Sequence, residues 1–335
     1  MIRRMRGEPP RDLSKPLEEV KVRIDAPLDG VRLDVALTKF LTWRSRNSIL
    51  DLIRDGHVVL EGRRVRKASR VRKGDVITVQ IPPRPEADPV APEDDSDIHI
   101  LYQDRGLVAV DKPAGLAVHP AGRRVHGTLI HWLHSRYRRP EDPVHDVVPR
   151  LLHRLDRETS GLVMVSLNPD LHAKLGMQFE ARQVAKVYHA VVHGCPPEPE
   201  GVIDRSIGPD RRSAIRLKLR ADPDEGGLPA LTRYRVLRSN ERFSLVELRP
   251  RTGRTHQLRV HMDAIGCPVV GDKIYGVEDD VFLEYLHGEL SESTRERLVL
   301  ARHALHSASL TFQHPGENRE MTLTAPLHAD MAALV

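Results

Sequence analysis

The sequence predicts an α+β fold in which a small helix–helix–strand module precedes a larger module, built on a mixed, largely antiparallel sheet flanked by helices and loops. The length of 335 residues is enough for two domains of ordinary size. Residues 82–97 carry five prolines, six acidic residues and no aromatic residue, which is typical of an extended linker. Beyond them, β-like and helical segments alternate in a mixed order without an internal repeat.

Composition and boundaries divide the chain into four parts. We expect a disordered tail at 1–20, the small module at 21–83, an acidic, proline-rich linker at 84–97 and the large module at 98–335. No apolar run approaches the roughly 20 residues that span a bilayer, and no apolar stretch follows the basic N-terminus as in a secretory signal. The two cysteines, Cys195 and Cys267, make a disulfide framework unlikely on number alone and fit a cytoplasmic protein.

Charge is distributed unevenly along the chain. Residues 1–83 hold 19 Lys/Arg and 11 Asp/Glu, a balance of +8, and residues 84–97 hold one Arg and six acids, a balance of −5. The net charge of +5 then leaves +2 for residues 98–335. A basic N-terminal module is expected for a polyanion partner, although a solvated basic surface has the same composition.

The small module contains two expected helices followed by short strands. Apolar spacing predicts helices over 31–41 and 45–56, the second capped by Ser45 or Asn47 and ended by Gly56. Strands are expected at 57–62 and 75–81. The basic stretch between them could place several cations on one face, as phosphate binding requires.

This module resembles the S4-type RNA-binding domain over roughly residues 31–81, on the segments RLDVALTKFL, SRNSILDLIRDGHVVLEG and KGDVITV. The resemblance implies binding to structured RNA through shape and backbone more than through base sequence. The candidate RNA-binding residues of the module are Arg46, Arg63, Arg64, Arg66 and Lys67.

The large module mixes strands and helices. Apolar runs and alternation predict strands at 99–104, 107–113, 161–167, 184–194, 231–240 and 243–250. Helices are expected at 127–137 and 168–182, the latter with Asn168 as its cap and Pro169 in its first turn. We expect residues 255–266 to begin as a strand and continue as a helix. Residues 278–303 are expected to form a polar, helical surface excursion that does not touch the candidate residues.

Residues 153–162 read HRLDRETSGL and lie between apolar stretches, where charges are costly to bury. Arg154 and Asp156 share a face if the segment is extended, and the turn formers Thr-Ser-Gly follow at 159–161. A nearby cation would keep the carboxylate ionised and usable as a nucleophile or base. From these residues alone, a structural ion pair that pins the loop is the commoner explanation.

Two further segments carry candidate side chains. Tyr188 lies in the expected strand KVYHAVVHG, where its ring either stacks on a base or packs into the core. Four arginines fall within eleven positions of one another: Arg249, Arg251, Arg254 and Arg259. In a strand, Thr255, Gln257 and Arg259 would share one face, so that Arg259 could reach into a cleft; a basic edge strand facing solvent is the alternative.

The eighteen histidines raise the question of a metal site. His256 with His261, or His303 with His306, could be ligand pairs, but HExxH is absent and no acidic cluster accompanies them. The cysteines lack CxxC spacing, and PAGLAVHPAG lacks the GxxxxGK[ST] pattern of a nucleotide-phosphate loop. We therefore expect no metal site.

Together these segments resemble the RluA-type family of pseudouridine synthases. The matching segments appear in the family's order and span nearly all of 98–335: VDKPAGLAVHP (110–120), HRLDRETSGL (153–162), AKVYHAVVHG (185–194), RTGRTHQLRVHM (251–262), GCPVVGDKIYG (266–276) and ALHSASLTFQHP (304–315). The combination of HRLDxxTSG with GRTHQLRVH is highly specific, and an S4-type domain commonly precedes the catalytic domain of this family.

The resemblance implies a role for each matching residue. It makes Asp156 the catalytic aspartate, Tyr188 the active-site tyrosine and Arg259 the basic partner of the aspartate. Arg154 matches an arginine that in relatives can enter the RNA helix as the target base leaves. Arg254 and His256 are further candidates for RNA binding.

The implied reaction isomerises uridine in RNA to pseudouridine, so that the N-glycosidic bond breaks and C5 of the turned uracil bonds to C1′. Asp156 would either attack C1′ or remove the 2′ proton to give a glycal, and Tyr188 would stack on the uracil and could help remove the C5 proton. The target base must first leave its stack, at a cost of a few kcal/mol. No metal or nucleotide cofactor is implied, because the reaction has no redox step and no net hydrolysis.

Large-subunit ribosomal RNA is the first expectation for the substrate and transfer RNA the second, with a monomeric protein that binds no membrane. A non-catalytic RNA-binding or ribosome assembly factor on the same fold is the alternative, although binding alone would not require the Asp156 carboxylate. A metal-dependent RNA hydrolase lacks the clustered acids that it would need.

Overall fold

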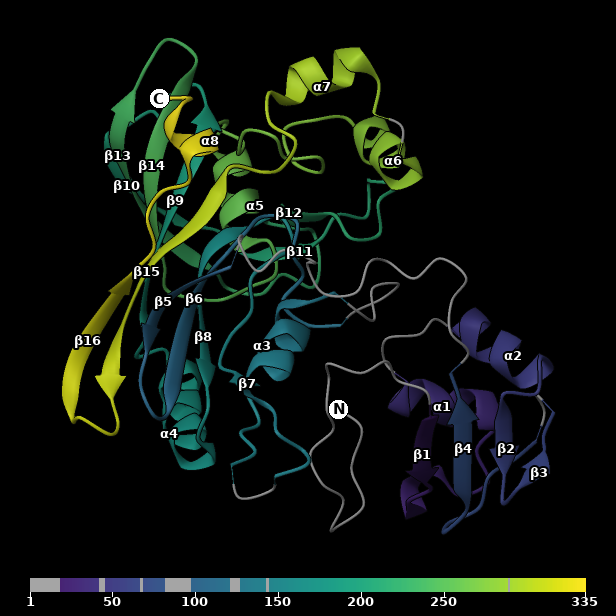
Figure 1. The fold of residues 1–335 in the computed structure, drawn as a ribbon. Helices are drawn as coiled ribbons and strands as arrows, with labels where there is room; N and C mark the ends of the chain where they lie inside the picture. The colour runs from purple at the N-terminus through teal and green to yellow at the C-terminus, as the bar shows by residue number, and fades with distance from the viewer. Residues whose placement is uncertain are drawn as a thin grey trace. The chain divides into compact units, whose positions relative to one another are not determined.

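The structure is a computed structural model that describes residues 19–41, 46–66, 69–81, 98–120, 127–142, 145–288 and 290–335. It divides into two compact units: Met1–Asp95 with Ala117–Pro149, and Ser96–Leu116 with Arg150–Val335 (Figure 1). Within the described residues, no helix is long and apolar enough to cross a membrane. The expected linker 84–97 and most of the expected tail 1–20 lie outside the described residues.

The first unit contains a four-stranded antiparallel sheet, the helices α1 (Leu33–Phe40) and α2 (Arg46–Arg54), a short 3-10 helix at Ala26–Leu28 and, from its second segment, α3 (Leu129–Tyr137). The strand order is β1 (Glu19–Arg23), β4 (Val76–Gln80), β2 (Val58–Leu60) and β3 (Arg63–Arg64). The helix–helix–strand order of the small module is therefore confirmed. Its buried apolar residues, among them Leu37, Ile49 and Val79, form one core.

Two details of this unit differ from the sequence prediction. β1 begins at Glu19, inside the expected tail, because Val20 and Val22 alternate into the core over a stretch too short to stand out in sequence. Asn47 lies within α2 and is not its cap, while Ser45 lies outside the described residues. Gly56 follows α2 with a φ of 82°, a left-handed conformation that favours glycine, as predicted.

The second unit is built on a ten-stranded mixed sheet. Eight strands follow the spatial order β10, β13, β14, β9, β15, β8, β6 and β5, while β16 pairs with β15 and β7 pairs with β8. The pair β15–β8 is parallel, and the other pairs of this sheet are antiparallel, so the expected mixed, largely antiparallel sheet is confirmed. The strands are β5 (His99–Gln103), β6 (Leu107–Lys112), β7 (Arg150–Leu151), β8 (Ser160–Ser166), β9 (Ala185–His193), β10 (Glu200–Asp204), β13 (Leu231–Ser239), β14 (Phe243–Pro250), β15 (Leu305–His314) and β16 (Arg319–Thr324).

Helices and a small ribbon complete this unit: α4 (Pro169–Glu180), α5 (Gln257–Ala264), α6 (Asp279–His287), α7 (Glu292–Leu298), α8 (Ala329–Ala332), β11 (Ile207–Pro209) and β12 (Leu219–Ala221). Oδ1 of Asn168 accepts the first backbone N–H groups of α4, so the predicted cap is confirmed. Apolar side chains of α4 pack with β6 and β8, and those of α5 pack with β9 and β14, so each half of the sheet has its own helix and core.

For residues 255–266, the predicted helix is confirmed and the predicted strand before it was wrong. No strand precedes the helix there, and α5 starts at Gln257, directly after His256 with its left-handed φ of 54°. The helix is buried on nearly all sides from Gln257 to Met262, so its sequence does not show a 3.6-residue apolar stripe, and the short alternation THQLRVH imitated a strand. The reading of this segment as a basic edge strand fails for the same reason.

Candidate active site

Asp156 lies in the loop that joins β7 to β8. The loop turns back before Thr159, whose N–H donates to the Asp156 carbonyl at 3.2 Å. β8 begins at Ser160, one residue before the expected strand 161–167, so Ser160 lies in the strand and not only in the expected turn. Gly161 has a φ of 101°, and a Cβ there would lie 2.4 Å from the Ser307 carbonyl oxygen, so β8 approaches β15 this closely because the residue is glycine.

A buried lysine holds this loop. Nζ of Lys112 donates to the backbone carbonyls of Pro113 (2.8 Å), Leu116 (2.9 Å) and Arg157 (3.1 Å). Burial lowers the pKa of Lys112 to about 7, with the charge of Arg302 acting in the same direction and that of Asp156 in the opposite one. The backbone directly after Asp156 is therefore held by the buried Lys112 side chain.

Arg259 and Asp272 form a buried ion pair. Nε and Nη2 of Arg259 donate to the two carboxylate oxygens of Asp272 at 2.6 and 2.8 Å, and Oδ1 of Asp272 also accepts the N–H groups of Ile274 and Tyr275. Burial alone would raise the pKa of Asp272, but the charge and hydrogen bonds of Arg259 lower it to about 2. Asp272 in turn raises the pKa of Arg259 against the effect of burial. This bidentate pair fixes the orientation of the guanidinium.

The remaining terminal nitrogen of the same guanidinium reaches Asp156. Nη1 of Arg259 lies 3.4 Å from Oδ2 of Asp156, whose side chain is 34% exposed. A cation on one side thus compensates the charge of a carboxylate that is still open to a ligand. Arg154 is exposed and forms no ion pair with Asp156, so the explanation of HRLD as a pair between these two residues is not supported.

His256 borders the Asp156 carboxylate from a second direction. Its Nε2 lies 4.0 Å from Oδ2 of Asp156, and its Nδ1 lies 2.8 Å from the hydroxyl of Tyr275. Burial and the charge of Arg259 lower the pKa of His256, so the imidazole is predominantly neutral near pH 7. Tyr275 also packs against Arg259, with Cζ 5.0 Å from its ring centroid. One tyrosine therefore positions both neighbours of the aspartate.

Tyr188 lies on β9, where it pairs with Leu248 of β14 and Ser307 of β15. The side chain is partly buried and packs against the core around α5. Burial raises the pKa of Tyr188 to about 12, and the negative charge of Asp156 acts in the same direction. The ring is therefore part of the core and also close enough to Asp156 to be affected by its charge.

Glu158, in the same loop, ties it to α6. Its carboxylate accepts hydrogen bonds from Nζ of Lys273 at 2.9 and 3.0 Å and from the hydroxyl of Tyr285 at 2.8 Å. Arg157 donates to the same tyrosine hydroxyl. The excursion 278–303 is helical as predicted, but it contacts the loop next to the candidate aspartate, which the sequence prediction did not expect.

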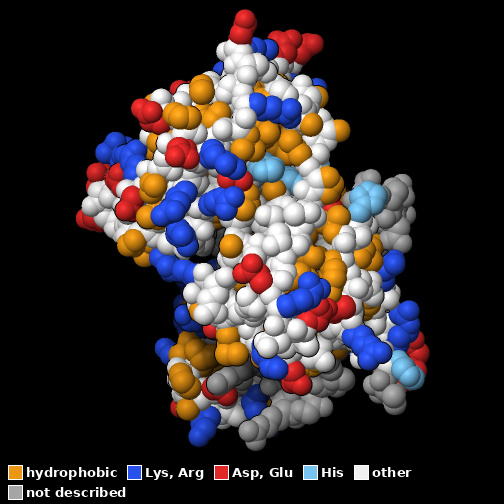
Figure 2. Space-filling model, turned by 90° about the vertical axis from the view of Figure 1, so that its left-hand side faces the viewer, with side chains coloured by type: hydrophobic (Ala, Val, Ile, Leu, Met, Phe, Trp, Pro, Cys, Tyr) orange, Lys and Arg blue, Asp and Glu red, His pale blue; other side chains and the backbone are white. Residues whose placement is uncertain are grey.

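Arg254 is half-buried and donates from Nε to the carbonyl of Pro229 at 3.2 Å. Figure 2 views the side of the molecule on which β10, β13 and β14 lie in Figure 1, and it shows Lys and Arg side chains interspersed with acidic and apolar ones. A groove of about 430 Å³ over these strands contains Arg235 and Arg249, but both form ion pairs with Glu247 at 3.4 and 2.9 Å. We therefore do not assign this groove to the polyanion.

The candidate residues of the first unit differ in their surroundings. Arg63, Arg64 and Arg66 are exposed. Arg63 and Arg64 are consecutive on β3 and leave it on opposite faces, so at most one of them can belong to the expected basic face. Arg46 is 55% exposed and forms an ion pair with the buried Asp34 at 2.8 Å. Lys67 lies outside the described residues.

Sequence reasoning assigned no role to Lys112, Glu158, Asp272 or Tyr275. All four stand in segments that carry the family resemblance, VDKPAGLAVHP, HRLDRETSGL and GCPVVGDKIYG. A charged residue directly after an apolar run, as in VAVDKP and VVGDK, was the available signal, because such a charge needs a buried partner. The identity of that partner depends on the tertiary structure.

Two groups of described residues could hold a metal ion: Asp111, His306 and His328, and Asp104, His314 and Glu317. Neither includes Asp156 or Arg259. Of the histidines considered as ligand pairs from the sequence, His306 belongs to the first group. His256 and His261 instead contact Tyr275 and Thr232, respectively.

The chain matches two family models. Residues 106–264 match the RNA pseudouridylate synthase model, and residues 31–77 match the S4 domain model. An uncharacterized RNA pseudouridine synthase of Chloroflexus aurantiacus is 37% identical over 98% of this chain and 96% of its own length. The ribosomal large subunit pseudouridine synthase D of Zymomonas mobilis is 35% identical over 94% of this chain and 96% of its own length.

Two solved human structures are also similar to this chain. The human RNA pseudouridylate synthase domain containing 1 is 29% identical, with a TM-score of 0.55, over 73% of this chain and 90% of its own. The human RNA pseudouridylate synthase domain containing 4 is also 29% identical, with a TM-score of 0.52, over 70% of this chain and 90% of its own. The range matched by the RNA pseudouridylate synthase model, 106–264, includes Asp156, Tyr188 and Arg259.

Proposed function

The chain belongs to the RNA pseudouridylate synthase family and is therefore an isomerase; on that premise we propose that it converts specific uridines of large-subunit ribosomal RNA to pseudouridine, with Asp156 as the catalytic residue. The observation that carries this proposal is the open Asp156 carboxylate beside Nη1 of Arg259 at 3.4 Å, while Asp272 anchors the other side of the guanidinium. Asp272, the structural partner of the same guanidinium, is by contrast fully enclosed.

Asp156 acts on the ribose in this proposal. Either its carboxylate attacks C1′ as the N-glycosidic bond breaks, or it removes the 2′ proton to give a glycal, and both routes remain open. In each route the released uracil turns over and C5 bonds to C1′, as the bond from Asp156 to C1′ breaks in the first route or as a proton returns to C2′ in the second. C5 then loses its proton and N1 takes one up, which restores the conjugated base. Arg259 balances the carboxylate charge before the step, and its anchoring by Asp272 avoids reorganisation during the step. No metal or cofactor takes part.

Tyr188 stacks on the flipped uracil in this proposal. Its raised pKa of about 12 keeps the phenol protonated at neutral pH, which favours stacking and hydrogen bonding over action as a phenolate base. His256, neutral near pH 7, is available to contact the substrate on the other side of Asp156. Arg154 and Arg254 are proposed to contact the RNA, and Arg154 is exposed as that requires.

The substrate assignment rests on relatives named ribosomal large subunit pseudouridine synthase D, among them those of Zymomonas mobilis and Pseudomonas aeruginosa. We propose that the S4 domain binds structured RNA through Arg46, Arg63, Arg64, Arg66 and Lys67, and that the protein works as a monomer in the cytoplasm. A non-catalytic RNA-binding factor on the same fold is the alternative, and the open carboxylate is the feature that binding alone would not need.

The test uses the purified full-length protein and large-subunit ribosomal RNA carrying tritium at C5 of uridine. Wild-type protein is expected to release tritium and to produce pseudouridine that chemical mapping detects, while Asp156→Asn lowers the rate by about 10⁴-fold or more and binds the RNA with unchanged affinity. Glu320→Gln, at an exposed carboxylate on β16, serves as the matched control and is expected to retain activity.

Two results would contradict the proposal. Tritium release by Asp156→Asn at the wild-type rate would exclude this aspartate from the chemistry. RNA binding by the wild type without any tritium release, on ribosomal and transfer RNA alike, would favour the non-catalytic factor.

A further inference from the structure

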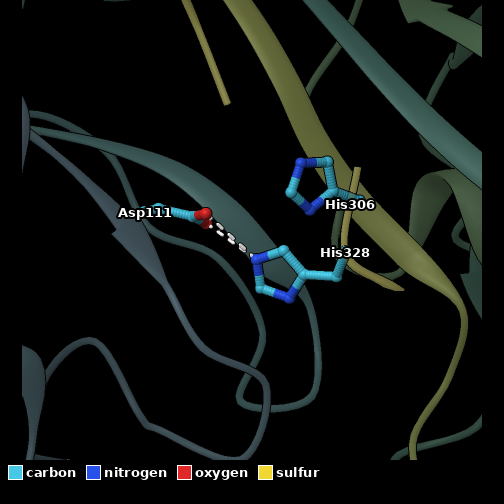
Figure 3. A group of neighbouring side chains, drawn as sticks. All are labelled: Asp111, His306 and His328. Carbon is cyan, nitrogen blue, oxygen red and sulfur yellow. Dashed lines mark hydrogen bonds and ion pairs between the residues drawn. The ribbon is translucent and has the colours of Figure 1, made fainter. Parts of the chain in front are cut away.

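Three side chains from separate segments of the second unit meet beside its central strands (Figure 3): Asp111 on β6, His306 on β15 and His328 just before α8. One possible ligand atom of each lies within 4.8 Å of the others. Nε2 of His328 lies 3.0 and 3.1 Å from the two oxygens of Asp111, and the two imidazole centroids are 4.9 Å apart. Two imidazoles and a carboxylate form a common ligand set for zinc.

Burial makes this arrangement costly without a cation. Asp111 is 5% exposed, and His306 is fully buried. Within the described residues, both oxygens of Asp111 share a single donor, Nε2 of His328, whereas a buried carboxylate usually has several. A metal ion would supply this buried carboxylate with a further partner.

We propose that Asp111, His306 and His328 bind one divalent transition-metal ion of the zinc type. At bond lengths of about 2.0–2.2 Å, tetrahedral ligand atoms lie roughly 3.4 Å apart, so small side-chain rotations bring the present atoms into position. The hydrogen bond between His328 and Asp111 gives way to a metal bond from each residue. His328 then carries its proton on Nδ1, and no proton needs to leave the protein.

The surroundings of His306 suit a metal ligand. Its Nδ1 lies 2.9 Å from Oγ of Ser160, and its Nε2 lies 3.4 Å from the carbonyl of Ala325. Whichever nitrogen binds the ion, the other retains an oxygen acceptor, and such a partner orients most metal-bound histidines.

A cavity of about 540 Å³ reaches Asp111 and His328 and gives the ion a path from solvent. His99 lines the same cavity and pairs with Asp111 across β5 and β6, so their side chains share a face. His99 or a water molecule completes the four ligands that a structural zinc ion prefers.

The two positively charged side chains near the proposed metal site, Arg302 and Lys112, are bonded to other groups. Arg302 lines the cavity, but its guanidinium donates to both oxygens of Asp330 at 2.7 and 2.8 Å, which balances its charge. Lys112 follows Asp111 in the chain, but its ammonium donates to the backbone carbonyls of Pro113, Leu116 and Arg157.

The ion has a structural role in this proposal. It joins β6, β15 and the segment before α8, which are far apart in sequence, and it takes no part in the chemistry at Asp156. The segment around α8 that it secures is also held by the ion pair of Arg302 with Asp330 and by the burial of Met331 in the core.

The experiment uses full-length, tag-free protein, stripped of metal by a chelator and titrated at pH 8 with Zn²⁺ against a chromophoric competitor. Wild-type protein is expected to bind one tight equivalent, and Co²⁺ is expected to give the visible absorption of a tetrahedral site. His328→Gln, at the most exposed ligand, weakens binding by about 10-fold or more. Asp111→Asn provides a second variant, and Zn²⁺ raises the melting temperature of the wild type more than that of either variant.

His314→Gln is the matched control, because His314 belongs to the other group of possible ligands, with Asp104 and Glu317. It is expected to bind Zn²⁺ as the wild type does. The proposal fails if wild-type protein takes up no tight equivalent. It also fails if His328→Gln and Asp111→Asn both bind as the wild type does, or if His314→Gln alone abolishes binding.

Discussion

Arg259 holds two aspartates in very different surroundings. On one side is the clamp, formed by Arg259 and Asp272, in which two short hydrogen bonds join a fully buried carboxylate to the guanidinium. On the other side is the open loop, residues 153–159, from which Asp156 meets the same guanidinium through one contact of 3.4 Å while 34% exposed. The ion pair of Arg259 with Asp272 is therefore closed to solvent, whereas its ion pair with Asp156 is accessible.

This difference separates two tasks that a single ion pair could not perform together. The clamp fixes the direction of Nη1, because the bidentate contact and two backbone N–H groups leave Asp272 no other orientation. Asp156 is thereby supplied with a cation without having to enclose it. The open loop is in turn held by Lys112 and Glu158, whose hydrogen bonds go to its backbone and to α6.

Asparagine at Asp272 should mainly lower stability, whereas asparagine at Asp156 should mainly abolish activity. Asp272→Asn leaves a buried guanidinium without its counter-charge and is expected to lower the free energy of unfolding by about 3–5 kcal/mol. Asp156→Asn removes one long, partly exposed contact and is expected to change that free energy by less than about 1 kcal/mol while activity is lost. Urea unfolding followed by circular dichroism measures the first quantity, and tritium release measures the second.

Equal losses of stability in the two variants would contradict the distinction between clamp and open loop. Asp272→Glu adds a further control, because it keeps the charge and lengthens the side chain. It should recover part of the stability if the charge is what matters, and none if the geometry of the bidentate contact decides.

Most of the fold could be predicted because many of its strands and helices carry long apolar patterns or a recognisable cap in the sequence. Strands such as β8 and β9 are apolar or alternating over seven or more residues, and α4 begins with a cap that is visible in the sequence. β1 was missed, and the start of α5 was predicted as a strand, because their cues are weak. β1 has five residues, and α5 has eight that are buried on nearly every side, so neither displays a period long enough to identify.

The candidate site likewise contains some residues that the sequence indicated and others that it did not. Asp156, Tyr188 and Arg259 were identified through motifs, and the structure brings Arg259 and His256 to the carboxylate of Asp156. Asp272 and Tyr275 stand 13 and 16 positions after Arg259, and their contacts depend on how the chain folds back beside α5. No local pattern could assign those contacts, although the charge in VVGDK indicated that a partner was needed.

The pH dependence of stability gives a second comparison between the two aspartates. The pKa of Asp272 in the fold, about 2, lies below its ordinary value of 3.8, so its contribution is present above about pH 4 and is lost as the pH falls towards 2. The loss should amount to about 2 kcal/mol. We expect the stability advantage of the wild type over Asp272→Asn to shrink over this interval, measured by urea unfolding at successive pH values. A constant advantage from pH 5 to pH 2 would show that the charge of Asp272 does not contribute.

Replacing Arg154 on the open loop should show whether this side chain contacts RNA or supports the fold. The effects expected from this change are the smallest of those predicted. Arg154 is exposed and makes no ion pair with Asp156, so Arg154→Ala should change the free energy of unfolding by less than about 0.5 kcal/mol. If the side chain contacts RNA, the same change should weaken RNA binding by about tenfold, measured by titration of labelled ribosomal RNA.

Arg105→Ala removes an exposed arginine from the turn between β5 and β6 and serves as the matched control for Arg154→Ala. It lowers the net charge by the same amount, so a purely electrostatic effect would weaken RNA binding equally in the two variants. Specific weakening in Arg154→Ala therefore indicates a contact made from the open loop. Loss of stability in Arg154→Ala would instead mean that Arg154 supports the fold, and that the open loop is less distinct from the clamp than the two aspartates suggest.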